Sequence, residues 1–571
     1  MKLRCFLLCV FCVSAVNSFS LDREAFSFTK YDLEARIEPA QQRLGVRGKI
    51  TLRNDSAAPQ KIAVLQITSS LNWRSIKAGG KQLQFVSQPY TSDIDHTGVL
   101  SEAVVTLPDA VPAKGSVELE IAYEGVIVLD AARLTRLGTP ETIANSTDWD
   151  QISEKFTAVR GVGYVAWYPI ATEDASLSET RSLPEVLQRW RAREADAAMH
   201  VQISVPSGAE EQKPELLVNA TTCPTALEVR QQFVAECTYQ SMGSLVPAFV
   251  IADYEVTDRA GVAVHFLLGQ DRAATTYADA AEKALPLITE WFGGPRSKAE
   301  TAELPDAGAA PFESGALLLT PLGGIDARRA GLAAAHQLTH AAFSSPRLWI
   351  NEGLAHFAQA LFMERQSGRQ AALDYIASHS SALTAKEKTK LPQSDDEARE
   401  SLINTPDGDL YRGKAMCVWW MLRDMIGDQA LKKALALYHA EQDKEPSYMQ
   451  RLIQAQTQRD LEWFFDDWVY RDRGLPDFRV QSAFTRKTLP EGYLLTITVE
   501  NLGSAGAEVP LTVKFAGGEV AKRLVVRGKS TGVIRVETSM RPEEIVVNDG
   551  SVPESDTTNN VFRIPENGAA K

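Results

Sequence analysis

The hydrophobic periodicity of this 571-residue chain changes twice, and each change marks a different kind of domain. Across residues 21–255, short segments such as "YDLEARIEP" and "SVELEIAYEG" alternate apolar and polar side chains, which is typical of strands. Across residues 256–478 the apolar residues return every three or four positions, as in "AATTYADAAEKALPLITEWFG". Alternation returns in residues 479–571, in "YLLTITVENLG" and "VPLTVKFAGG". We therefore expect a multidomain protein with an N-terminal β domain, an α-rich middle domain and a C-terminal Ig-like β-sandwich with a polar tail.

Residues 1–20 have the pattern of a secretory signal peptide. Lys2 and Arg4 precede the apolar run from Cys5 to Val16, which is too short to span a bilayer, and small residues suited to cleavage follow. No later stretch approaches the roughly twenty apolar residues of a transmembrane helix. We expect an exported protein, periplasmic, secreted or at the cell surface, with no transmembrane segment after signal removal.

The charge balance argues against one class of partner. The formal net charge is −13, and loss of Lys2 and Arg4 with the signal peptide takes it to −15. An acidic surface repels a phosphate backbone. We therefore expect no nucleic acid partner.

Three cysteines lie outside the predicted signal peptide. Cys223 and Cys237 are close enough in sequence for a local disulfide in an oxidising compartment, and two free buried thiols are the alternative. Cys417, in "AMCVWWML", is predicted to pack in the core because no electropositive histidine adjoins it.

The pattern in "AAAHQLTHAAFSSPRLWINEGLAHF" is typical of a metal site. His336 and His340 are four apart on a predicted helix, so both imidazoles project from one face, although two surface or capping histidines would show the same spacing. Pro346 ends this helix, and a second helix can turn Glu352 back toward the histidines as a third zinc ligand. The fourth position would stay open for water. His356, one turn further on, has three possible roles: supporting a ligand, being exposed, or being a ligand itself.

This stretch resembles the membrane alanyl aminopeptidase (aminopeptidase N-like) family of gluzincin zinc metallopeptidases. The family signature is H-E-x-x-H followed by a glutamate in the context W-L-N-E-G-F-A. "WINEGLA" matches that context at Trp349, Asn351, Glu352, Gly353 and Ala355. The resemblance implies a saddle-like N-terminal β domain, a thermolysin-like peptidase domain over residues 256–478, and one Zn²⁺ per chain held by the two histidines and the glutamate.

Two features depart from the family signature. Gln337 stands where the family has its catalytic glutamate, and only eleven residues separate His340 from Glu352, fewer than in the family. A glutamine amide has no basic site near neutral pH. We expect Gln337 to orient a metal-bound water without taking its proton, the activity to be weak, and Gln337→Glu to restore a general base.

Two more stretches extend the resemblance. "APFESGALLL" is similar to the family's G-A-M-E-N motif and places Glu313 where a carboxylate binds the substrate's α-ammonium group; an ordinary edge-strand glutamate is the alternative. "YRGKAMCVWW" is similar to the Y-E-K-G helix, in which the tyrosine stabilises the oxyanion. Tyr411 takes that position, with a core anchor as the alternative, and the order of Gly413 and Lys414 is inverted.

The resemblance implies an exported zinc metallo-aminopeptidase that acts on peptides with free amino termini. The first alternative is a catalytically inactive pseudo-peptidase that binds peptides or partner proteins. A second alternative is a β-rich surface protein with a vestigial helical domain, which would require the three zinc-ligand types to be coincidental.

Overall fold

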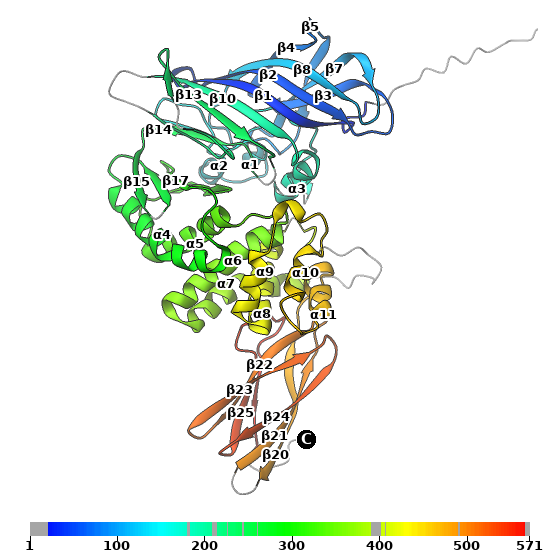
Figure 1. Ribbon diagram of the computed structural model, residues 1–571, viewed down its shortest axis with the longest axis vertical. Coiled ribbons are helices and arrows are strands. Elements are labelled where there is room, and N and C mark those ends of the chain that lie inside the picture. The colour runs from blue at the N-terminus through cyan, green and yellow to red at the C-terminus, as the bar shows by residue number, and fades with distance from the viewer. Residues whose placement is uncertain are drawn as a thin grey trace, which may run out of the picture.

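The computed structural model describes residues 21–179, 183–207, 214–224, 227–242, 245–259, 261–389, 401–405, 407–488 and 492–565; the predicted signal peptide lies outside them. Three parts follow one another along the long axis: a β-rich N-terminal part, a helical middle part and a C-terminal part of two sheets (Figure 1). The multidomain fold predicted from the periodicity is confirmed. None of the helices in the described ranges has the length and apolar character needed to cross a membrane.

The largest sheet forms the top of the N-terminal part. Its first long strand pairs antiparallel with its successor and parallel with a strand some 170 residues later. Every second residue from Tyr31 to Ile37 is buried, because one face of this sheet covers the core and the other faces solvent. Across the sheet the order is β12 (Leu227–Val229), β13 (Gln232–Tyr239), β10 (Ala198–Pro206), β1 (Phe26–Glu38), β2 (Arg43–Asn54), β8 (Ser116–Val126), β4 (Leu71–Ala78) and β5 (Lys81–Gln82).

Two smaller sheets and three short helices complete the N-terminal part. Helix α3 lies on the side that faces the helical middle part (Figure 1). The sheets run in the orders β3 (Gln60–Thr68), β7 (Val99–Val111), β6 (Phe85–Thr91) and β11 (Glu215–Val218), β14 (Phe249–Ala252), β9 (Phe156–Val159). The helices are α1 (Ala132–Arg136), α2 (Glu141–Thr147) and α3 (Leu183–Glu194), with 3₁₀ turns at Pro39–Gln41 and Leu177–Glu179.

The middle part combines a five-stranded sheet with a bundle of helices. The sheet runs in the order β15 (Glu255–Arg259), β16 (Val262–Phe266), β17 (Ala299–Glu303), β19 (Leu317–Thr320) and β18 (Phe312–Ser314), so that β18 is an edge strand. The helices are α4 (Asp271–Phe292), α5 (Ala327–Ala342), α6 (Leu348–Ser367), α7 (Arg369–Thr389), α8 (Ala415–Ile426), α9 (Asp428–Ala436), α10 (Tyr448–Gln454) and α11 (Glu462–Phe465). Two π-helical segments, Asp409–Lys414 and Asp466–Tyr470, and a 3₁₀ turn at Ala440–Gln442 join them.

Small residues bring α5 and α6 close to their neighbours. The Asp326 side chain accepts a hydrogen bond from the Arg329 amide and caps the start of α5. Alanines then fill the buried face of α5. At Gly353 on α6, a Cβ atom would lie 2.7 Å from the Cβ of Ala415, so only glycine permits this approach to α8. Glu352 therefore lies beside the segment that carries Tyr411.

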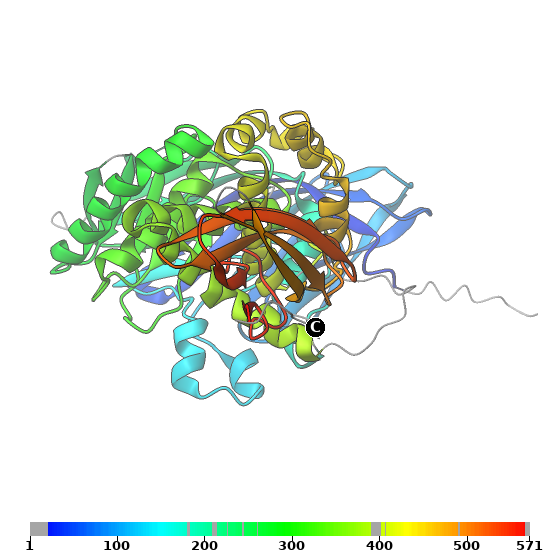
Figure 2. The same ribbon diagram turned by 90° about the horizontal axis from the view of Figure 1, so that it is seen from below.

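The C-terminal part is a sandwich of two antiparallel sheets. It extends below the helical middle part in Figure 1 and lies in front of it in the view from below (Figure 2). Trp468, at the end of the helical part, is buried and donates from Nε1 to the carbonyl of Gly506, which fixes the junction. One sheet runs β20 (Phe478–Thr488), β21 (Gly492–Asn501), β24 (Thr531–Thr538), and the other β23 (Gly518–Val526), β22 (Ala507–Phe515), β25 (Pro542–Val547), β26 (Val561–Arg563).

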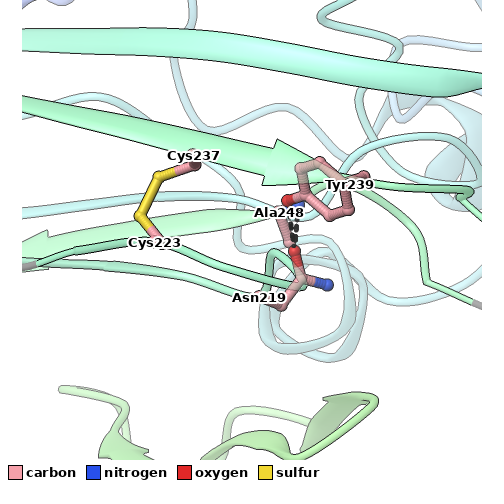
Figure 3. Close-up of a disulfide and its surroundings, with 5 residues drawn as sticks. All are labelled: Asn219, Cys223, Cys237, Tyr239 and Ala248. Carbon is pink, nitrogen blue, oxygen red and sulfur yellow. Dashed lines mark hydrogen bonds between the residues drawn. A yellow bond between two sulfur atoms is a disulfide. The ribbon is translucent and has the colours of Figure 1, made fainter.

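A disulfide and a buried amide hold the lower edge of the N-terminal part (Figure 3). Cys223 is bonded to Cys237 on β13, as the spacing predicted, and Cys417 is a buried free thiol in α8. Nearby, Asn219 Oδ1 accepts hydrogen bonds from the Tyr239 hydroxyl at 2.8 Å and the Ala248 amide at 2.9 Å.

The other end of the Asn219 amide ties the two parts of the molecule together. Its Nδ2 donates to the carbonyl of Val246 at 2.8 Å and to the Ser314 hydroxyl on β18 at 2.7 Å. Strand β18, which carries Glu313, is thereby fixed against the N-terminal part. Asn219 also begins the N-x-T sequence Asn219-Ala220-Thr221, in which the asparagine side chain is the site of glycosylation. The same two bonds occupy its Nδ2, which argues against glycosylation at this residue.

Candidate metal centre and cleft

A cleft of about 1120 Å³ lies between the N-terminal and middle parts. Residues of α3 and of the segment after β13 line one side, and β18, α5, α6 and the first π-helical segment line the other. All but one of the site residues predicted from the sequence face this cleft: Glu313, His336, His340, Glu352 and Tyr411. The exception is Gln337.

The two histidines converge as the helical spacing predicts. Both lie on α5, and their Nε2 atoms are 3.2 Å apart. Two nitrogen ligands of a tetrahedral zinc ion, each about 2.0–2.1 Å from the metal, lie about 3.3 Å apart. The amide nitrogen of Asn351, from "WINEG", lies 3.3 Å from His340 Nδ1 and helps to fix the ring. The imidazole pair therefore has the spacing of a metal chelate.

Two carboxylates complete the cluster. Glu352, on α6, places its oxygens 3.5 Å from His340 Nε2 and 3.8 Å from His336 Nε2. Glu313, on the edge strand β18, lies closer, with Oε2 3.1 Å from His336 Nε2. The ligand atoms of Glu313, His336 and His340 all lie within 4.8 Å of one another. Glu313 Oε1 is buried and has no hydrogen-bond partner among the described residues. A buried oxygen of this kind is suited to binding a cation.

The electrostatics of the cluster favour the ionised form of Glu352. Burial raises the pKa of Glu352, but His340, His336 and Arg412 outweigh burial and hold it at about 2. Burial lowers the pKa of His336, yet the neighbouring Glu313 and Glu352 raise it above its usual value. For His340 burial prevails, and its pKa is lowered. Two carboxylates beside two imidazoles form a donor set suited to a divalent cation.

These residues fit a zinc ion. His336, His340 and Glu352 would hold it, with Glu313 near enough to share the cation or to bind an ammonium group beside it. When bound, zinc supplies a Lewis acid that lowers the pKa of a bound water and polarises a carbonyl.

Gln337 does not line the cleft, and every donor and acceptor of its side-chain amide has a hydrogen-bond partner. Its side chain is completely buried, and Oε1 accepts hydrogen bonds from the Tyr277 hydroxyl at 2.8 Å and the Thr301 hydroxyl at 2.9 Å. Its Nε2 donates to the carbonyls of Glu300 at 2.8 Å and Ala316 at 3.0 Å.

The expectation that the Gln337 amide orients a metal-bound water is therefore corrected. An amide has two donor hydrogens and two acceptor lone pairs, and all four are engaged within the protein. The bonds join α5 to α4, β17 and the residue before β19. The Gln337 side chain therefore links helix α5 to the sheet. The sequence could not show this, because its four partners come from distant segments.

Tyr411 lies in the π-helical segment Asp409–Lys414 that precedes α8. The extra residue per turn of such a segment is frequent at functional sites, and here it turns Tyr411 into the cleft. Burial raises the pKa of the phenol, so it is a neutral hydrogen-bond donor over the physiological range. Tyr411 thus lines the same cleft as the metal-ligand cluster, while its predicted role in stabilising an oxyanion stays a prediction.

His356 packs against one of the two histidines of the cluster. Its ring centroid lies 5.0 Å from that of His336 and 5.6 Å from that of His379, and it lines the cleft. Burial lowers its pKa well below the usual value. Of the three roles that the sequence left open, the contact with His336 favours support of a ligand.

The sequence did not identify two arginines that line the cleft. Arg412 Nε lies 3.4 Å from Glu352 Oε2, and Arg191 reaches the cleft from α3 of the N-terminal part. The sequence held one indication of a role for Arg412, namely that it occupies the position at which the family motif Y-E-K-G has a glutamate. Nothing near Arg191 in the sequence pointed to the cleft.

Comparison with known proteins agrees with this geometry. Residues 343–468 match the model of the Peptidase family M1 domain. This segment of the chain is therefore similar to a peptidase M1 domain. The matched segment contains Glu352 and Tyr411 but begins after the two histidines. The predicted relationship to the aminopeptidase N-like gluzincins is confirmed at this level. Together with the metal-ligand cluster, it also agrees with the predicted zinc.

Solved structures show the same fold for most of the chain. The M1 zinc metallopeptidase from Deinococcus radiodurans and a point mutant of it each share 16% sequence identity with this protein, at a TM-score of 0.51. Each alignment covers 79% of this chain and 96% of the other. No curated protein matches the sequence. The M1 architecture is therefore conserved here while most of the sequence has changed.

The ligand geometry predicts about one zinc per chain. His340→Ala removes one nitrogen of the chelate and should release the metal on dialysis, whereas His439→Ala, at an exposed position, should not. Elemental analysis of dialysed wild type and both variants measures this. Wild-type protein that holds no metal even after zinc addition would contradict the assignment.

The environment of Gln337 predicts that Gln337→Glu fails to restore a base. An ionised carboxylate there would face the carbonyls of Glu300 and Ala316, which costs about 1–3 kcal/mol of unfolding free energy. These carbonyls raise the pKa of the new carboxyl in the folded state. The folded protein then binds the proton more tightly than the unfolded chain, so the loss should grow as the pH rises through the unfolded value of about 4.3.

Urea unfolding at pH 5 and pH 7.5 measures the loss, with Gln458→Glu as the exposed control. Turnover of aminoacyl substrates at equal zinc occupancy provides the second measurement, and we expect no gain. A tenfold gain in turnover would show instead that residue 337 reaches the metal-bound water.

Proposed function

We propose that this protein is an exported, zinc-binding M1 protein that binds peptides through their free amino termini and hydrolyses them slowly. The observation that carries the proposal is the buried, fully bonded Gln337 behind a cleft that otherwise keeps the zinc ligands, the edge strand and the tyrosine. A positioned general base contributes about 10² to 10⁴ in rate, and this site lacks one at the family's position.

Recognition of the amino terminus is assigned to Glu313. The residue lies on an edge strand, along which an extended peptide can add as a further strand. Its carboxylate lies next to the metal ligands, so an ammonium group bound there would place the first peptide bond over the zinc site. The unpartnered Oε1 supplies an acceptor for that ammonium group.

Other acidic residues of the cleft do not replace the missing base. Glu300 lines the cleft, and burial raises its pKa. Its charged neighbours are Lys298, Glu215 and Asp258, with neither histidine among them. Tyr411 would donate a hydrogen bond to a carbonyl oxygen, which helps a slow reaction but takes no proton from water. Slow hydrolysis by the metal site alone is the result.

Export is part of the proposal. The Cys223–Cys237 disulfide supports it, since such bonds persist in oxidising compartments. The expected signal peptide supports it as well.

Peptide-binding measurements test the role of Glu313. Zinc-loaded wild type should bind a free tripeptide at least tenfold more tightly than its acetylated form, because a hydrogen bond to a charged group contributes about 1.5–3 kcal/mol. Glu313→Gln should remove this preference. Glu300→Gln, which alters a cleft carboxylate away from the histidines, should retain it.

Isothermal titration calorimetry gives the affinities, and zinc analysis of each variant separates loss of recognition from loss of metal. Equal affinity of the wild type for free and acetylated peptides would contradict the proposal.

A further inference from the structure

Arg412 brings a positive charge into the part of the cleft that holds the zinc ligands. Its Nε lies 3.4 Å from Glu352 Oε2, and its guanidinium carbon lies 5.3 Å from the centre of the Tyr411 ring. About half of its side chain is exposed, at 52%, so the group is accessible to a ligand. The family motif has a glutamate at this position, so the local charge is reversed in this chain.

The charge of Arg412 is not balanced once a metal is bound. Glu352 and Glu313 are the carboxylates that act on Arg412 among the described residues, and both face the zinc ligands. Two carboxylates balance one divalent cation, which leaves the guanidinium without a counter-charge. Arg191 lines the other side of the cleft from α3. An anionic group on the ligand would correct this imbalance.

The distance between the two ends of the site suits a short peptide. Contacts of 3.1, 3.8 and 3.4 Å run in series from Glu313 Oε2 through His336 Nε2 and Glu352 Oε2 to Arg412 Nε. Because these distances share their end atoms, Glu313 Oε2 and Arg412 Nε are no more than about 10 Å apart. An extended di- or tripeptide spans about 7–10 Å.

We propose that Arg412 binds a carboxylate of the peptide ligand. The ligands are then short peptides held at both ends, or peptides with an acidic side chain close to the amino terminus. A guanidinium group binds a carboxylate through paired, charge-assisted hydrogen bonds, which gives orientation as well as affinity. The inference rests on the proposed function, because Glu313 must hold the other end of the same peptide.

Four probes test the proposal by calorimetry on zinc-loaded protein: tri-alanine, tri-alanine amide, Ala-Asp-Ala amide and acetyl-tri-alanine. We expect tri-alanine to bind the wild type at least tenfold more tightly than its amide, as one charge-assisted pair would give. Recovery of affinity with Ala-Asp-Ala amide would show that a side-chain carboxylate serves as well; no recovery would assign the site to the terminal carboxylate. Either result supports a carboxylate site.

Variants locate the effect. Arg412→Gln should remove the preference for a carboxylate while zinc content and the preference for a free over an acetylated amino terminus stay as in the wild type. Arg412→Glu should reverse the preference, so that the amide binds more tightly than tri-alanine. Arg563→Gln, which changes an exposed arginine of the C-terminal sandwich, should match the wild type.

The outcomes separate the two proposals. Equal wild-type affinity for tri-alanine and both amides, or a carboxylate preference that persists in Arg412→Gln, would overturn the assignment of Arg412. If the wild type binds acetyl-tri-alanine as tightly as tri-alanine, the result would instead count against Glu313 and the proposed function. Absence of binding for all four probes would overturn both.

Discussion

The position of helix α5 against its sheet depends on the four hydrogen bonds of a single buried amide. Gln337 joins this helix to Tyr277 on α4, to Thr301 and the carbonyl of Glu300 on β17, and to the carbonyl of Ala316 before β19. The bonds fix the rotation of α5 about its axis. His336 and His340 then project into the cleft, because they lie about a quarter of a turn around the helix from this tie. A buried amide with all its bonds made is rigid, and one left unpaired is costly.

The same constraint separates metal binding from proton transfer. A neutral amide can donate to two carbonyls and accept from two hydroxyls at once, whereas an ionised carboxylate accepts only. The surroundings of residue 337 thus suit glutamine, and its side chain is held apart from the imidazoles and carboxylates that line the cleft. Glu313 on the edge strand and Arg412 beside Glu352 face the same cleft with opposite charges. In the function that we propose, this arrangement holds a short peptide and cuts it slowly.

Much of the architecture followed from local sequence patterns. The two changes of hydrophobic period predicted β, α and β parts in the right order, and the four-residue spacing of His336 and His340 placed both rings on one face. "WINEG" predicted the return of Glu352, which the close approach at Gly353 makes possible. These features depend on neighbours within a few turns of chain, where periodicity and steric rules apply directly.

Features that depend on distant segments could not be predicted. Each partner of the Gln337 amide lies at least twenty residues away, and the tie between Asn219 and Ser314 joins segments 95 residues apart. Arg191 reaches the cleft from another part of the molecule. The replacement of glutamate by glutamine suggested a missing base, but only the packing around residue 337 showed that the side chain faces away from the metal ligands.

Mass spectrometry of peptides incubated with the zinc-loaded protein tests the central claim most directly. Free tripeptides at concentrations that saturate the cleft should remain largely intact, with turnover below about 10⁻² s⁻¹, two or more orders of magnitude under the 1 to 10³ s⁻¹ typical of enzymes. Release of amino-terminal residues at about 1 s⁻¹ or faster, with one zinc bound per chain, would contradict this account and require another group of the cleft to act as the base.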